Sequence, residues 1–345
     1  MFKKKFKRSA SYYLDNLRIY ILFVLLFLAA VLFAPNFFNI FNLNSLLKAS
    51  NLYAVMGIGL TLVMLTGELD LSIQSVMNTG AIVALFMFSK LDMSWGVSII
   101  CALLSGAVVG LVNGLLVAKA KITSFIVTLG TMTVMQGAVY LFCSQGSIGV
   151  KGNFDFTDTL TTPIIPLLPP ITIVTIVLVI VVALMLRYTR LGRNIYMVGG
   201  NSETAWLAGI NKDRVYVAVF VMSGVLSALA GALFAIGQGA AVPNMGEKGI
   251  NPLMVTIAST IIGGTAMNGG KGGVVKTYVA TITLQIIFNM LSCMGQGYEV
   301  QLFAAGLLLV LIVLYESVSV YQQDKIKGIR RAMLPEAKIL MAKKR

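Results

Sequence analysis

Long apolar stretches separated by short polar segments recur from one end of the chain to the other. A helix of about 20 apolar residues is long enough to cross the roughly 30 Å hydrocarbon core of a bilayer. Backbone groups inside that core must bond to one another, which favours helices. We therefore predict an all-α, polytopic helical membrane protein with about ten transmembrane helices. The predicted spans are 19–34, 48–66, 73–90, 95–118, 124–143, 168–186, 215–238, 253–266, 274–294 and 299–318.

The first apolar run, Ile19 to Ala34, raises the alternative of a cleaved secretory signal because a basic segment precedes it. The run ends in Pro35, Asn36 and Phe37 rather than in the small-residue pattern of a cleavage site. We interpret it as a retained first span.

Charge placement tests the span count independently. With the N-terminus inside and ten spans, 23 of the 27 Lys and Arg residues face one side. Only Lys48, Lys90, Lys151 and Lys248 face the other. Cytoplasmic loops retain positive charge in this way, so we expect both termini to be cytoplasmic.

Composition supports a membrane protein, since 57% of the residues are hydrophobic and 12% are charged, against roughly 45–50% and 25% in soluble domains. The net charge of +14 also raises nucleic-acid binding as an alternative. Because the charges flank hydrophobic spans, topology and anionic lipid headgroups explain them better. We expect membrane lipid, and no nucleic acid, as a partner.

The chain has no histidine, which removes His-based acid/base catalysis, Ser-His and Cys-His nucleophiles and imidazole metal ligands. Cys101, Cys143 and Cys293 lack metal-ligand spacing and are expected to pack as small apolar residues. An intramembrane enzyme is disfavoured for the same reasons. We expect no catalytic residue, metal or cofactor in this chain.

The first of three unusual polar segments runs from Thr66 to Ser72 and places Glu68 and Asp70 between two apolar runs with no basic neighbour. One interpretation is a helix break near membrane depth, where charge marks a pathway or an internal pair. The other is that Asp70 or Ser72 caps the following helix. Glu68 and Asp70 are two residues apart, so they would not share a helix face.

The second segment is the longest basic interval between spans, residues 187–214. Within it, Gly199-Gly200-Asn201-Ser202 predicts a turn with Ser202 as N-cap, followed by a short helix that ends at Gly209. This helix is unusually apolar for a loop, so it must pack either on the chain's own spans or on a partner protein.

The third segment, Ile262 to Gly273, holds six glycines among twelve residues and permits left-handed backbone and close chain approach. It lacks the preceding strand and the G-K-[ST] ending of a phosphate-binding loop, which favours a tight turn. Elsewhere, Gly106, Gly110 and Gly114 recur every four residues and predict one smooth helix face for close packing.

Together these segments resemble the permease subunits of bacterial ABC importers for simple sugars, the ribose-type group, over residues 46–314. The motifs that carry the resemblance are Gly67-Glu68-Leu69-Asp70-Leu71-Ser72, Asn113-Gly114-Leu115-Leu116-Val117, Phe125-Ile126-Val127-Thr128-Leu129-Gly130-Thr131, Thr189-Arg190-Leu191-Gly192-Arg193, Gly199-Gly200-Asn201, and Gly263-Gly264-Thr265 with Gly269-Gly270-Lys271-Gly272.

The resemblance implies a permease homodimer or close heterodimer in the bacterial cytoplasmic (inner) membrane, two cytoplasmic ABC ATPase domains that bind the ATP, and an extracytoplasmic sugar-binding protein. It also implies that Glu203, Ala205 and Gly209 belong to an E-A-A-x-x-x-G coupling helix, in which Thr204 replaces the second residue. Gln74 departs from the family pattern, where an apolar residue and glycine usually follow Asp-Leu-Ser, and leaves the sugar open.

The predicted spans and the placement of charge divide the chain into a basic cytoplasmic N-terminal segment (1–18), a transmembrane permease domain (19–318) with its coupling loop (187–214), and a basic cytoplasmic tail (319–345). The chain lacks G-x-x-x-x-G-K-[ST], so the ATPase must be another polypeptide. The alternative is an ion-coupled secondary carrier that uses Glu68 or Asp70. Candidate substrate-pathway residues are Thr66, Gly67, Glu68, Asp70, Ser72, Gln74, Asn113, Thr128, Thr131, Gly263, Gly264, Thr265 and Asn268. Candidate ATPase-coupling residues are Arg190, Gly192, Arg193, Gly200, Asn201, Glu203, Thr204, Ala205 and Gly209.

Overall fold

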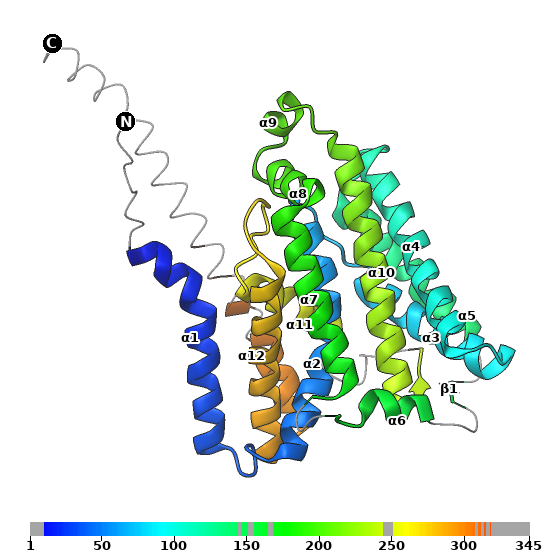
Figure 1. Cartoon of the computed structure of the whole chain (residues 1–345), viewed down its shortest axis with the longest axis vertical. Helices are drawn as coiled ribbons and strands as arrows, with labels where there is room; N and C mark the ends of the chain where they lie inside the picture. The colour runs from blue at the N-terminus through cyan, green and yellow to red at the C-terminus, as the bar shows by residue number, and fades with distance from the viewer. Residues whose placement is uncertain are drawn as a thin grey trace, which may run out of the picture.

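The chain folds into a bundle of helices, many of them side by side (Figure 1). The computed structural model describes residues 10–143, 146–150, 155–164, 168–243, 251–307, 310, 311, 314 and 318. Its elements are α1 (Ala10–Phe33), α2 (Ile40–Leu65), α3 (Ile73–Leu91), α4 (Trp95–Ala118), α5 (Ser124–Phe142), β1 (Ile148–Gly149), α6 (Asp155–Thr161), α7 (Pro170–Tyr188), α8 (Arg190–Gly200), α9 (Ser202–Leu207), α10 (Lys212–Gln238), β2 (Ala240–Ala241), α11 (Pro252–Ile262) and α12 (Val274–Cys293).

Six of these helices, α2, α4, α5, α7, α10 and α12, are long and apolar enough to cross a membrane. They coincide with six of the predicted spans, which confirms a helical, multi-pass membrane protein. The run predicted at 19–34 overlaps α1, whose apolar part, Leu17–Phe33, is shorter than the six candidate spans. α3 matches the predicted 73–90 in position but carries polar residues and is not among the six.

The centre of the bundle is formed by α2 and α10, which pack against each other and between them contact α3, α4, α7, α11 and α12. The apolar window of α2 is 78% buried and that of α10 is 72% buried, against 17% for α5. A helix that is apolar all round is an interior helix, as the buried stretch from Ala54 to Leu65 shows. α5 and α4 present apolar side chains outward, as helices at a lipid or protein boundary do.

The predicted glycine face of α4 is confirmed, because Gly106, Gly110 and Gly114 all lie against α10. A Cβ atom at Gly110 or at Gly114 would stand 2.8 Å from the Cα of Val221 or Val217, respectively. One at Gly106 would collide with the carbonyl of Gly224. Small residues thus bring the two backbones into direct contact.

Two predicted boundaries were wrong. α2 begins at Ile40, not at 48, because the side chain of Asn39 caps the helix by accepting a hydrogen bond from Phe41 N at 2.9 Å. Side-chain hydrogen bonds, such as the one from Asn42 to Asn289, stabilise the polar first turns. α11 ends at Ile262 rather than at 266, because the chain turns at Gly263 and enters the left-handed region at Gly264, with φ +83°.

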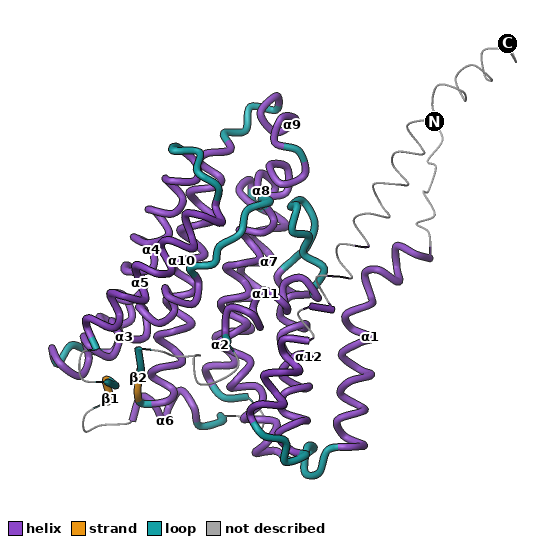
Figure 2. Tube along the Cα trace, turned by 180° about the vertical axis from the view of Figure 1, so that it is seen from behind, coloured by secondary structure: helices purple, strands orange, loops and turns teal. Residues whose placement is uncertain are grey.

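Several elements were not predicted from the sequence: α6, α8 and the short antiparallel pair of β1 with β2, which joins Ile148 to Ala241. Figure 2 shows α6, β1 and β2 at the end of the bundle opposite α9, and α1 at one edge beside α12. Of the predicted last span, residues 299–307 are helical. The rest of that span, apart from four helical positions, lies outside the described residues, as do residues 1–9 of segment 1–18 and the tail 319–345.

Candidate functional site

The three unusual polar segments of the sequence meet at one end of the bundle, the end that carries α8 and α9 in Figure 1. Gly270 N donates a hydrogen bond to Leu65 O at 2.9 Å. A Cβ atom at Gly269 would stand 2.7 Å from Gly67 N and 2.9 Å from the Cα of Gly199. Sequence reasoning identified each segment but not their meeting.

We call Gly67, Gly199, Gly200, Gly269 and Gly270 the glycine junction. A Cβ at Gly270 would stand 2.7 Å from the Cα of Gly200, so the backbones touch with no side chain between them. Gly67, Gly269 and Gly270 also have φ of +84°, +81° and +73°, a region that favours glycine. The predicted turn at Gly199-Gly200 was wrong: both residues end α8, where their missing side chains admit the neighbouring loop.

Asp70 lies in the break between α2 and α3 and is only 2% exposed. Its Oδ1 accepts hydrogen bonds from Ser72 N at 3.0 Å and from Ser72 Oγ at 2.6 Å. Its Oδ2 accepts one from Ser223 Oγ, in the middle of α10, at 2.8 Å. Asp70 therefore holds Ser72, the N-cap residue of α3, and ties it to the central helix, whereas the side chain of Ser72 makes no capping hydrogen bond to α3.

The hydrogen bonds of this break continue to α4 and α5. Asn113 Nδ2 donates to Ser72 Oγ at 2.9 Å, and Thr131 Oγ1 donates to Asn113 Oδ1 at 2.6 Å. Leu71 N donates to Thr128 Oγ1 at 3.1 Å. We call Asp70, Ser72, Asn113, Thr131 and Ser223 the Asp70 network.

The structure thus brings together five predicted pathway residues: Asp70, Ser72, Asn113, Thr128 and Thr131. Ser223 was missed because nothing in the apolar sequence around it indicates a partner 153 residues away. Ser124, whose Oγ accepts from Leu69 N at 3.1 Å, was missed for the same reason.

The other residues of this break engage different partners. Glu68 is half-buried and is not among the hydrogen-bond partners of Asp70. Thr66 is buried and donates to Val63 O at 2.7 Å, and Gln74 is half-buried in the first turn of α3. Glu68 and Asp70 therefore do not act as a pair, in line with their spacing.

The predicted pathway residues of the glycine-rich loop, residues 263–273 between α11 and α12, differ in burial. Gly263 is buried, and a Cβ there would stand 2.8 Å from Thr277 N at the start of α12. Gly264 and Asn268 are exposed. Thr265 is buried, and its Oγ1 has no hydrogen-bond partner among the described residues.

α8 lies between α7 and α9 in the chain and is hydrogen-bonded to the glycine-rich loop. It begins after Thr189, whose Oγ1 accepts from Gly192 N at 3.1 Å, and buries Gly192 against α7. Tyr196 donates its hydroxyl to Gly272 O at 3.0 Å, and burial raises the pKa of this hydroxyl above its ordinary value. Arg190 and Arg193 are exposed.

α9 is a six-residue helix fixed at both ends. Its N-cap is Asn201 rather than the predicted Ser202, because Asn201 has extended backbone and its Oδ1 accepts from Thr204 N at 2.9 Å. At the other end Gly209 has φ +76°, and Gly209 N and Ile210 N donate to Trp206 O and Ala205 O. This is a Schellman motif, which confirms that Gly209 terminates the helix.

The two sides of α9 differ in exposure. Ala205 is fully buried, whereas Trp206 and Leu207 are 71% and 77% exposed. Glu203 and Thr204 are exposed beside them. An apolar surface of this kind at the tip of a loop is typical of a protein-binding site.

Comparison with known proteins gives the family of this architecture. A family model described as "Branched-chain amino acid transport system / permease component" matches residues 42–313. No solved structure matches the chain. The family model thus covers most of the chain.

Individual relatives agree with this match. The chain is 32% identical over 308 residues to a ribose import permease protein of Haemophilus influenzae, covering 88% of this chain and 94% of that protein. The ribose import permease protein of Bacillus subtilis is 33% identical over 297 residues, covering 86% and 90%. The L-arabinose transport system permease protein of Escherichia coli is 28% identical over 310 residues, covering 88% and 90%. The chain therefore belongs to this family of transport-system permease components, as its resemblance to ribose-type importer permeases indicated.

Proposed function

We propose that this chain is the membrane-spanning subunit of an ATP-driven ABC importer and forms, with a second permease copy, the translocation pathway for a simple sugar. Family membership, the ribose and arabinose permeases among its relatives and six apolar helices support this function. A ten-span topology with both termini inside would place α8, α9 and the glycine junction at the cytoplasmic surface. The transported solute is a pentose, a hexose or a related sugar, delivered by an extracytoplasmic binding protein.

The observation that carries the coupling role is the construction of α9. A helix of six residues is too short to be stable alone, yet Asn201 and Gly209 fix both its ends. A rigid helix with Trp206 and Leu207 exposed fits an apolar groove on a partner. In this proposal the partner is one of two ATPase domains, which bind and hydrolyse the ATP.

A displacement of α9 would be transmitted to the bundle through α8 and two hydrogen bonds of the glycine-rich loop. α9 follows α8 without a linker other than Asn201, and α8 is bonded to the glycine-rich loop through Tyr196 and Gly272. That loop is in turn bonded to the end of α2 through Gly270 N and Leu65 O. Closure of the ATPase pair would therefore displace the ends of α2 and α12 together and alter the opening of the pathway.

Within this function the Asp70 network positions the helices that line the pathway. A carboxylate that accepts three hydrogen bonds and is 2% exposed keeps α3, α4 and α10 in register. The ion-coupled alternative would require Asp70 to release and rebind a cation, and its occupied oxygens do not favour that role. Among the pathway candidates, Gly67, Gly264 and Asn268 are exposed, and Glu68, Gln74 and Thr131 are half-buried.

The coupling role is tested by replacing Gly209 with Val and, separately, Glu203 with Ala in the assembled importer. Valine at φ +76° disrupts the end of α9, and Glu203 stands on its exposed side. We expect normal expression and membrane insertion, with sugar uptake lost relative to ATP hydrolysis. Gly96→Ala is the control, because nothing stands within 4 Å of that position. Unchanged uptake in both coupling variants would rule out the proposal.

A further inference from the structure

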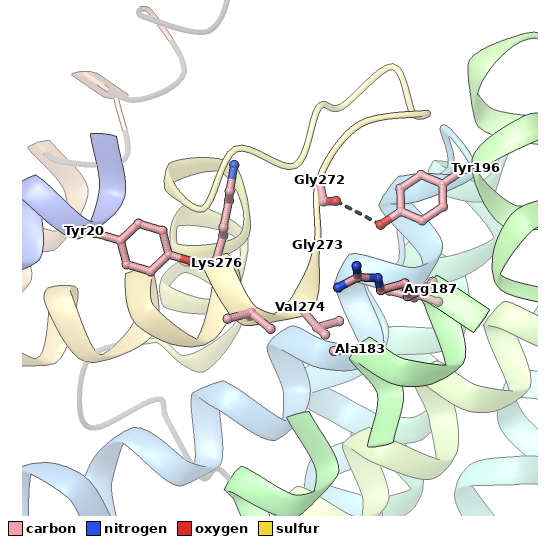
Figure 3. A pocket seen from close by; sticks show the side chains of 10 residues that line it. Tyr20, Ala183, Arg187, Tyr196, Gly272, Gly273, Val274 and Lys276 are labelled. Atoms are coloured by element: carbon pink, nitrogen blue, oxygen red, sulfur yellow. Dashed lines mark hydrogen bonds between the residues drawn. The ribbon is translucent and has the colours of Figure 1, made fainter. Parts of the chain in front are cut away.

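A cavity of about 390 Å³ opens between α1, α7, α8 and α12, next to the glycine-rich loop (Figure 3). Its wall includes Tyr20 of α1, Arg187 of α7, Tyr196 of α8 and Lys276 of α12. Figure 3 shows Arg187 and Lys276 on either side of the Gly272–Gly273 segment. The remaining wall is mostly aliphatic, with Ala183, Leu186, Val274 and Val275.

Positive potential converges on this cavity from three sources. Arg187 lies in the last turn of α7, where its Cζ stands 5.3 Å from the ring centroid of Tyr188. Lys276 lies in the first turn of α12, where the helix dipole is already positive and a cation is unfavourable. No acidic residue stands in that first turn, and no side chain caps it. An anion in the cavity would be attracted by all three.

The cavity lies where a lipid headgroup would be found. α7 and α12 are two of the candidate membrane spans, and the cavity is at the end of both. Tyrosines such as Tyr20 and Tyr196 are typical of the boundary between hydrocarbon and water. Below Tyr20, α1 exposes Ile21, Val24 and Leu25, which offer an apolar surface for acyl chains.

We propose that this cavity binds one anionic phospholipid of the cytoplasmic leaflet. Its phosphate is held by Arg187 and Lys276 near the start of α12, and its acyl chains lie along α1. Guanidinium and ammonium groups are the usual phosphate ligands of proteins, and basic pockets between membrane helices are a general form of headgroup site. The bound lipid joins α1 to the glycine-rich loop, and thereby to the glycine junction.

The test measures the phospholipid that stays with the purified importer after exhaustive detergent exchange, in wild type and in Arg187→Gln/Lys276→Gln. The control is Lys121→Gln/Arg214→Gln, which removes two positive charges from exposed positions outside the cavity. We expect wild type and control to retain about one phosphatidylglycerol per permease chain and the cavity variant to retain at least threefold less. Equal retention in all three proteins would overturn the proposal.

Two further arms separate the sources of the phosphate and exclude misfolding. In wild type, phosphatidylcholine should not replace phosphatidylglycerol, and millimolar inorganic phosphate should not displace it. Displacement by inorganic phosphate alone would overturn the lipid assignment in favour of a free anion site. The cavity variant should elute from a size-exclusion column at the wild-type size. The charge-preserving variant Arg187→Lys should retain as much phosphatidylglycerol as wild type. Retention by Arg187→Lys as low as that of the cavity variant would also count against a charge-based site.

Discussion

The contact of α4 with α10 gives a prediction whose size follows from the structure. Replacing Gly110 with Ala adds a methyl group that collides with the carbonyl oxygen of Phe220 and stands 2.8 Å from the Cα of Val221, whereas carbon atoms in ordinary contact stand about 3.5–4.0 Å apart. The two helices must separate locally by roughly 0.7–1.2 Å. Overpacking of this kind costs about 1–3 kcal/mol, while the higher helix propensity of alanine returns about 1 kcal/mol.

A second loss follows from the position of Asn113, one turn from Gly110 on the same face of α4. A displacement of that size along its 2.9 Å hydrogen bond to Ser72 Oγ would lengthen the bond beyond about 3.5 Å and break it, at a cost of about 0.5–1.5 kcal/mol. The net destabilisation expected for Gly110→Ala is therefore about 0.5–3.5 kcal/mol, from the overpacking, propensity and hydrogen-bond terms together.

The assay is reversible unfolding of the purified protein in detergent micelles, followed by far-UV circular dichroism. Gly96→Ala is a matched control, because it makes the same substitution in the same helix where nothing stands within 4 Å. Its free energy of unfolding should equal that of wild type or exceed it by up to about 1 kcal/mol, the gain in helix propensity alone. A Gly110→Ala variant as stable as Gly96→Ala would refute the close contact of the two backbones.

Three further predictions concern the site. Asn113→Ala removes the donor to Ser72 and should lower the free energy of unfolding by about 1–3 kcal/mol, measured in the same assay; Asn113→Asp, which cannot donate, should not rescue it. The pKa of Tyr196 is raised above its ordinary value of 10.0, so its hydroxyl contributes stability that is fully present below pH 10 and is lost as the pH rises through the folded-state pKa. Tyr196→Phe should remove this contribution to the pH dependence of the free energy of unfolding, measured from pH 8 to 11. Asn201→Ala removes the cap of α9 and should cost about 0.5–2 kcal/mol of helix stability. Sugar uptake per ATP hydrolysed should fall while the global free energy of unfolding stays near that of wild type, and an unchanged ratio would contradict a coupling role for α9.

Much of the bundle could be predicted from the sequence because hydrophobicity and small-residue spacing are local properties. The apolar runs located the candidate spans, and the four-residue spacing of Gly106, Gly110 and Gly114 predicted the face that meets α10. Gly209 was also identified as the end of α9, since a left-handed C′ residue is a local requirement.

The remaining features depend on partners that are distant in the sequence. α8 was not predicted because its three glycines lower helix propensity, and no local signal indicates that Ile195 and Val198 are buried against the bundle, where they stabilise the helix. The polar first turns of α2 were excluded from the span for a similar reason, since the partner of Asn42 is Asn289 in α12. Pairing of Asp70 with Ser223 has no local sequence signal at all.

ATP-driven import is tested by sugar uptake into liposomes that contain the complete importer, with the sugar-binding protein outside and ATP inside. We expect sugar accumulation that requires ATP and stops when ATP is absent, even if a proton or sodium gradient and a membrane potential are imposed. Accumulation driven by such a gradient without ATP would contradict ATP-driven import and would assign Glu68 or Asp70 to an ion-coupled carrier.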